Sequence, residues 1–156
     1  QEMGLSEETQ AAVLMAGVVH DIGKIQVPAE ILATPGQLSA AQFELIKMHP
    51  NAGYEILKEI SFKQPIAEIV KQHHERLDGS GYPDGLTGDN ILIEAQIIGV
   101  ADTVEAMASH RPYRPGLGID AALAEITEQR GKTYNSEAVD ACIRLFNQKN
   151  YHFEPF

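Results

Sequence analysis

The sequence predicts an all-helical fold, a compact bundle of about seven helices around a single core. Six or seven segments repeat their apolar residues every 3.6 positions, and no segment between turn signals alternates as a β-strand does. At 156 residues the chain has the size of one domain and is long enough to bury a substantial core. We therefore expect residues 1–156 to form a single domain.

The first half of the chain contains four of the expected helices. The first spans residues 6–22, because a serine N-cap followed by two acidic residues begins it and Gly23 can end it. A connection rich in Pro and Gly leads to a helix over residues 39–47, whose start resembles a capping box. A proline in the first turn favours the next helix, at residues 50–60, and a fourth is expected at residues 65–75.

The second half begins with a long glycine-rich loop and continues with three helices. The loop covers residues 77–90 and contains four glycines. The helix expected at residues 92–109 is the most apolar, and two prolines in "HRPYRPG" prevent its continuation. The last two helices are expected at residues 119–130 and 136–147.

Composition and charge exclude several classes of partner. The formal net charge is -10, whereas binding to a nucleic-acid duplex needs a basic face. No apolar run has the length of a membrane span, so we expect no membrane contact by this domain. The single cysteine, Cys142, excludes an intrachain disulfide and a Cys-based zinc site, which fits a cytoplasmic protein. Any metal ion would therefore be bound by histidines and carboxylates.

Two adjacent histidines end the fourth expected helix. Ile66, Ile69, Val70, His73 and His74 occupy positions i, i+3, i+4, i+7 and i+8, which form one apolar stripe. Both imidazoles are therefore expected to face the interior. Each neutral ring brings a donor and an acceptor that must be satisfied there, and a shared cation would use both rings.

The first expected helix repeats this pattern. Val13, Ala16, Gly17, His20 and Asp21 occupy the same five positions, so a histidine and an aspartate join the buried face. An aspartate is almost never fully buried unless it is paired or bound to a metal, because desolvation of a carboxylate is costly.

Two more candidate ligands lie on apolar stripes. His49 follows Leu45 and Ile46 by four and three positions, at the end of its expected helix. Asp102 lies four residues after Ile98, on the inner face of the most apolar helix.

Four histidines and two aspartates from four helices are thus expected inside the fold. Unrelated core hydrogen bonds are the alternative, but a metal centre explains all six side chains together. Two ions that share a bridging carboxylate would use six ligands and still leave positions for water and substrate. Such ligands suit Fe, Mn, Co, Ni and Zn alike.

A centre of two cations favours phosphoester hydrolysis, because it can clamp both oxygens of an in-line displacement at phosphorus. Lys24 follows Asp21 by one helical turn and is placed to stabilise phosphate oxygens, although the helix dipole alone also favours a lysine there. Arg111 and Arg114 suit phosphate recognition, or they cap the preceding helix.

Five motifs together resemble the HD-GYP domain, a branch of the HD phosphohydrolase superfamily. They are "HDIGK" at 20–24, "HP" at 49–50, "HHERLDGSGYPDG" at 73–85, "VADTVEAM" at 100–107 and "RPYR" at 111–114. The HD pair alone is shared by hydrolases of many substrates, whereas the HH and GYP string in register with it is specific. The resemblance covers about residues 5–136.

The resemblance implies a bacterial phosphodiesterase that converts cyclic di-GMP to linear pGpG, and in some members onward to GMP. Asp21 and Lys24 would then be the catalytic residues, and Asp21 would bridge two divalent transition-metal ions, with iron or manganese favoured. The residues that would complete the two metal sites are His20, His49, His73, His74 and Asp102. The residues that would contact substrate are Lys24, Tyr82, Arg111 and Arg114.

One departure from the family pattern affects the expected partners. Members of that family carry a further metal-binding histidine upstream of the HD pair, and no histidine precedes His20 here. We therefore expect a missing N-terminal helix, an upstream sensor or receiver domain, and exposed apolar surface. The GYP loop could also contact a second copy of the chain or a diguanylate cyclase.

Two alternatives to the phosphodiesterase are kept. A non-hydrolytic module that senses cyclic di-GMP, or docks on a protein, would fit the missing histidine. A hydrolase of another cyclic dinucleotide would keep every metal ligand and change only the contacts to the bases. The complete HD pair favours the enzyme that acts on cyclic di-GMP.

Overall fold

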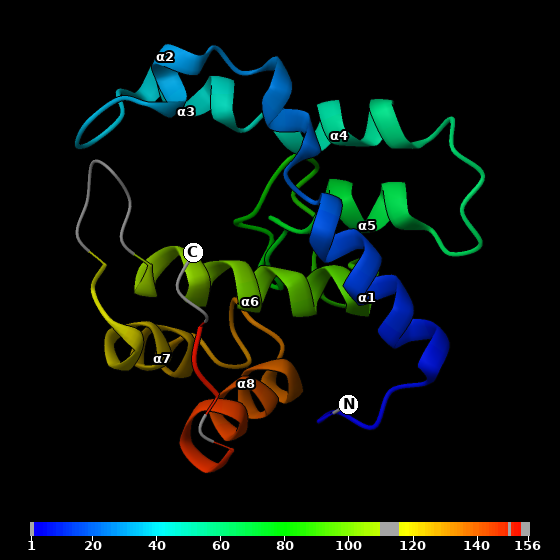
Figure 1. The fold of residues 1–156 in the computed structure, drawn as a ribbon, viewed down its shortest axis with the longest axis vertical. Helices are drawn as coiled ribbons and strands as arrows, with labels where there is room; N and C mark the ends of the chain where they lie inside the picture. The colour runs from blue at the N-terminus through cyan, green and yellow to red at the C-terminus, as the bar shows by residue number, and fades with distance from the viewer. Residues whose placement is uncertain (1, 110–115, 150, 154–156) are drawn as a thin grey trace.

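The computed structural model describes residues 2–109, 116–149 and 151–153, and these form an all-helical fold (Figure 1). Each helix expected from the sequence is present, and the described residues contain isolated β-bridges but no strand. The bounds are α1 Glu7–Val19, α3 Ala40–Ile46, α4 His49–Leu57, α5 Ile66–Gln72, α6 Ile93–Ala108, α7 Ile119–Glu128 and α8 Ser136–Gln148. The predicted fold class is confirmed.

Three short helical turns were not predicted. They are α2 (Ala29–Leu32) and the 3-10 turns η1 (Ile22–Gln26) and η2 (Gly88–Asn90). A segment of one turn is too short to show a helical period, and the sequence around α2 had been interpreted as a plain connection. In Figure 1, α2 and α3 lie together at one edge of the molecule.

The first helix is shorter than predicted. Its N-cap is correct, since Ser6 Oγ accepts the Thr9 backbone N–H at 3.2 Å, but α1 ends at Val19 and not at Ile22. The chain then tightens into η1 and presses Gly23 against α4, where a Cβ atom on Gly23 would lie 1.9 Å from the His49 carbonyl oxygen. The two residues between Val19 and Ile22 therefore lie in a turn and not on the helix.

The start of α4 also corrects the prediction. The capping box at Ser39 is present, but α3 ends at Ile46 and His49 is the first residue of α4. His49 was predicted to face inward because it continues an apolar stripe with Leu45. Leu45 is 41% exposed, so this stripe is not buried and that reason was wrong. His49 is nevertheless buried, because α4 packs on both η1 and α5.

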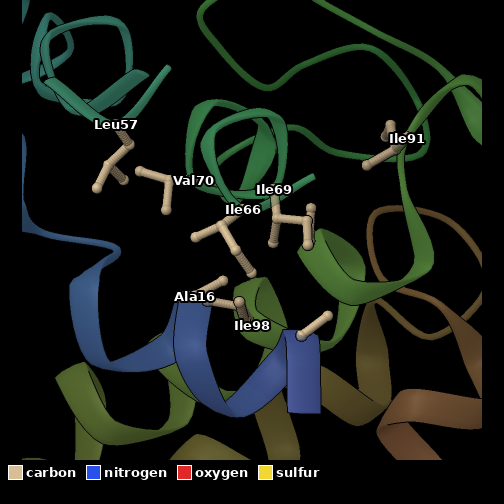
Figure 2. Close-up of a cluster of buried hydrophobic side chains, with 9 residues drawn as sticks. Ala16, Leu57, Ile66, Ile69, Val70, Ile91 and Ile98 are labelled. Atoms are coloured by element: carbon tan, nitrogen blue, oxygen red, sulfur yellow. The ribbon is translucent and has the colours of Figure 1, made fainter. Parts of the chain in front are cut away.

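Two buried clusters form the core, and α6 contributes to both. Figure 2 shows the first, in which Ile66 of α5 projects toward Ala16 of α1 and Ile98 of α6, and Val70 lies beside Leu57 of α4. The second cluster lies between α6, α7 and α8. Its buried members are Val100, Val104, Ala122, Leu123, Ile126, Ala138 and Val139. α6 therefore joins the two halves of the fold.

No described helix is long and apolar enough to cross a membrane.

An apolar groove lies between α1, α6 and α8. Its volume is about 580 Å³, and Val13, Ile97 and Leu145 are among the residues that line it. Along α1, Leu14, which also lines the groove, and Val18 are 71% and 76% exposed. Apolar surface is thus exposed, as expected, and the missing N-terminal helix stays a prediction.

Candidate metal centre

Three histidine side chains meet where α4 and α5 pack side by side. His49 begins α4, and His73 and His74 follow the last turn of α5. One ring nitrogen from each lies within 4.8 Å of the other two. The exposed fractions of His49 and His73 are 1% and 0%, and His74 is partly buried, so these rings face inward as expected.

Backbone carbonyls orient three of the imidazoles in the same way. Each ring uses Nδ1 to contact the carbonyl oxygen three residues earlier. The pairs are His20 with Gly17 at 2.7 Å, His49 with Ile46 at 2.7 Å, and His73 with Val70 at 2.5 Å. Because a carbonyl only accepts, Nδ1 must carry the proton, and the Nε2 lone pair is left to face the other ligands.

The closest pair of nitrogens shows that this set of donors fits a cation. His49 Nε2 and His73 Nε2 are 3.3 Å apart. Burial lowers the pKa of His73 to about 3 and lowers that of His49, so both rings are neutral near pH 7. Two lone pairs then face each other without a proton between them. A metal ion would turn this repulsion into coordination.

Asp21 lies between the imidazoles of His20 and His49. Its Oδ1 atom is 3.5 Å from His49 Nε2, and its Oδ2 atom is 3.5 Å from His20 Nε2. Asp102 Oδ1, from α6, is 3.8 Å from the same His20 nitrogen. The Asp21 side chain is 39% exposed, so its predicted place on a buried helix face was wrong. It lies in the turn beyond α1, open on one side.

Lys24 lowers the pKa of the Asp21 carboxyl. Burial acts to raise the pKa of the Asp21 carboxyl, but the hydrogen bond and positive charge of Lys24 outweigh this and hold it below its usual value. The Lys24 Nζ to Asp21 Oδ2 distance is 2.6 Å. Asp21 is therefore ionised at neutral pH and can bind a cation. The ammonium of Lys24 lies next to the same carboxylate.

The glycine-rich loop brings Tyr82 onto the histidines. The Tyr82 ring stacks on that of His74 with centroids 4.7 Å apart and planes at 26°. The Tyr82 backbone N–H donates to the His74 carbonyl at 3.2 Å. Gly81 allows this approach, because a Cβ atom there would lie 2.4 Å from the Arg76 nitrogen. Burial raises the pKa of the Tyr82 hydroxyl, which therefore stays protonated.

Glu75 anchors the loop and was missed by the sequence analysis. Its side chain is buried, at 4% exposure, and its two oxygens accept the backbone N–H groups of Asp84 at 2.7 Å and Leu86 at 2.9 Å. A signal was available, since an acidic residue next to two inward-facing histidines needs partners if it is buried. Those partners are backbone amides of an irregular loop, which no sequence period predicts.

The structure thus brings together the predicted metal ligands with Lys24 and Tyr82. These candidate ligands come from α4, α6 and the ends of α1 and α5, and they are His20, Asp21, His49, His73, His74 and Asp102. Two predicted substrate contacts, Arg111 and Arg114, lie outside the described residues.

An all-helical fold with adjacent His and Asp at the end of a helix, close to further histidines, defines an HD-type domain. Comparison with known families agrees, since the HD domain family matches residues 1–138. The chain belongs to the HD domain family.

Individual relatives and one solved structure are similar over most of the chain. Cyclic di-GMP phosphodiesterase response regulator RpfG of Xanthomonas campestris is 45% identical over 92% of this chain, which spans 39% of that protein. 3'3'-cGAMP-specific phosphodiesterase 1 of Vibrio cholerae is 39% identical over 97% of this chain and 35% of its own length. The structure of Bd1817, an HDG"Y"P protein from Bdellovibrio bacteriovorus, aligns with a TM-score of 0.76 at 18% identity, over 94% of this chain and 47% of that one.

Proposed function

We propose that this chain is a metal-dependent phosphodiesterase that hydrolyses cyclic di-GMP to linear pGpG in bacterial second-messenger signalling. The observation that carries the proposal is the position of Asp21, whose two carboxylate oxygens each lie 3.5 Å from a different imidazole Nε2. The relative from Xanthomonas campestris, 45% identical and named for cyclic di-GMP, supports the substrate.

The proposed cofactors are two divalent transition-metal ions, iron or manganese first among them. Asp21 would bridge the two sites. The other ligands would be His49, His73 and His74 at one site, and His20 and Asp102 at the other. When bound, the ions supply Lewis acidity and lower the pKa of coordinated water.

The side chains around the ions supply orientation and charge. Hydrogen bonds from Nδ1 hold the rings of His20, His49 and His73, so that the Nε2 atom of each is left to bind an ion. Lys24, Arg111 and Arg114 would balance the negative charge that builds on the phosphoryl oxygens. Tyr82 would border the nucleotide.

The test is chromatography of cyclic di-GMP after incubation with protein loaded anaerobically with Mn²⁺ or Fe²⁺. We expect linear pGpG from the wild type and no product from His73→Ala, which removes a buried ligand. Binding of cyclic di-GMP without a linear product would instead identify a sensing module.

Hydrolysis of another cyclic dinucleotide is the second candidate. The observation that favours it is the 39% identical relative named as specific for 3'3'-cGAMP. Cyclic di-GMP and 3'3'-cGAMP offered together as competing substrates separate the two candidates through the ratio of their kcat/KM values.

We also propose a cytoplasmic setting and control by a sensor or receiver domain. The chain spans 39% of a relative that is named as a response regulator, which supports this arrangement. For protein partners, we propose a homodimer or a contact with a diguanylate cyclase through the GYP loop.

A further inference from the structure

α3 places an exposed aromatic ring beside the candidate metal centre. Phe43 is 44% exposed, and its ring meets that of Tyr82 edge to face, with centroids 6.4 Å apart and planes at 82°. Tyr82 in turn stacks on His74. A continuous set of ring contacts therefore leads from a candidate metal ligand to an aromatic surface that water can reach.

A cation lies over the same two rings. Lys47 Nζ is 5.2 Å from the centroid of Phe43 and 5.8 Å from that of Tyr82, within the range of a cation–π interaction. Its ammonium also pairs with Glu44 at 2.8 Å, and the Lys47 side chain is 32% exposed. The ammonium is thus held at the edge of the aromatic surface and remains within reach of a ligand.

Helical spacing alone does not explain this arrangement. Tyr54, Glu55 and Lys58 have the same spacing as Phe43, Glu44 and Lys47, with Lys58 Nζ 5.9 Å from the Tyr54 ring and 2.6 Å from Glu55. The additional feature at α3 is Tyr82, which comes from the loop that follows the metal-centre histidines. The fold has therefore brought a local aromatic and cation pair to the side of the centre.

We infer that Phe43 and Lys47, together with Tyr82, form a subsite for a purine base of the substrate. Aromatic faces bind bases by stacking, and an ammonium donates hydrogen bonds to O6 and N7 of guanine. A base in this position would lie next to the ions that hold its phosphate. The inference rests on the proposed phosphodiesterase and names the residues that would recognise the base.

The first test compares Phe43→Ala with Phe43→Tyr in the metal-loaded protein. Loss of a stacked base should raise KM for cyclic di-GMP about tenfold, with a smaller effect on kcat, and Phe43→Tyr should restore most of the affinity. Leu45→Ala is the matched control, since Leu45 is 41% exposed on the same helix and should leave KM unchanged. Bound metal and Tm are measured for each variant. A change in KM without a change in metal content or Tm reports on the subsite and not on folding.

The second test asks whether Lys47 favours guanine. GMP should inhibit the wild type better than AMP does, and Lys47→Met should remove most of that preference, whereas Lys58→Met should keep it. An unchanged KM in Phe43→Ala with wild-type turnover intact would overturn the subsite alone. If the wild type shows no turnover, the proposed function fails. The subsite is then tested by the Kd of cyclic di-GMP for wild type and for Phe43→Ala. Equal Kd values, or no binding to the wild type, would overturn it.

Discussion

At the scale of single residues, the candidate centre depends most on Asp21. It lies at the turn between α1 and η1, with imidazole nitrogens on two sides and the Lys24 ammonium on a third. Lys24 lowers the pKa of the carboxyl against the effect of burial, and burial keeps His73 neutral. Both protonation states are those that metal coordination needs.

Asp21→Ala should therefore remove most of the bound metal. We expect one to two transition-metal ions per chain in wild-type protein purified anaerobically, measured by elemental analysis, and a small fraction of that in the variant. Asp140→Ala is the matched control, because Asp140 also pairs with a cation, Arg130 at 2.6 Å, but lies elsewhere on the surface. Metal-free wild-type protein under these conditions would contradict the proposed centre.

At the scale of elements, the glycine-rich loop is held by a buried carboxylate. Glu75 accepts two loop amides, and Lys71 Nζ pairs with Asp84 at 2.6 Å, so the same stretch of loop is tied to the end of α5 twice. These contacts keep Tyr82 near His74. The loop is thus positioned by side chains in α5 and just after it, next to two candidate metal ligands.

Glu75→Gln should loosen this loop. An amide oxygen can replace one acceptor, but its NH₂ group then faces the second backbone donor, so one partly buried N–H loses its acceptor. We expect the free energy of unfolding to fall by about 1–3 kcal/mol, and hydrogen exchange at the amides of Asp84 and Leu86 to accelerate. Glu59→Gln, on the surface, should change neither quantity. Unchanged exchange at both amides would show that Glu75 does not anchor the loop.

Two glycine substitutions should change stability in opposite directions. Gly81→Ala places a Cβ atom 2.4 Å from the Arg76 nitrogen, so the loop must shift and the free energy of unfolding should fall. Gly17, inside α1, has open space around its Cβ position, and Gly17→Ala should raise that free energy by about 0.5–1 kcal/mol. Denaturant unfolding measures both. Equal effects would contradict the close packing of the loop on the α5 end.

At the scale of the whole molecule, the candidate ligands connect the helices that form the first core. They come from α4, α6 and the ends of α1 and α5, and the same helices contribute the first buried cluster. An ion that binds only the native state therefore stabilises the packing of these four helices.

Addition of Mn²⁺ should raise Tm. Mass action predicts about 2.7 kcal/mol of stabilisation when the free ion is at 100 times its Kd. Calorimetry of EDTA-treated protein with and without Mn²⁺ measures the shift, and Asp21→Ala should show much less of it. A wild-type Tm that does not respond to saturating Mn²⁺ would rule out this coupling.

The sequence predicted most of the helices, but only some of their ends. Apolar periods of several turns identified α1 and α5 to α8, because a long amphipathic segment can bury its stripe only as a helix. The single turns of α2 and η1 have no such period. The ends near Asp21 and His49 were misplaced, because packing of Gly23 on the His49 backbone decides where the chain turns.

What the sequence determined by itself is the all-helical class and the inward direction of His73 and His74. Both follow from local periodicity, which acts within a few residues along the chain. Tertiary structure alone decided that Asp21 lies between His20 and His49, that Glu75 holds the loop, and that Phe43 meets Tyr82. These contacts join residues far apart in the sequence, and they depend on how helices pack and where turns close, which no local pattern specifies.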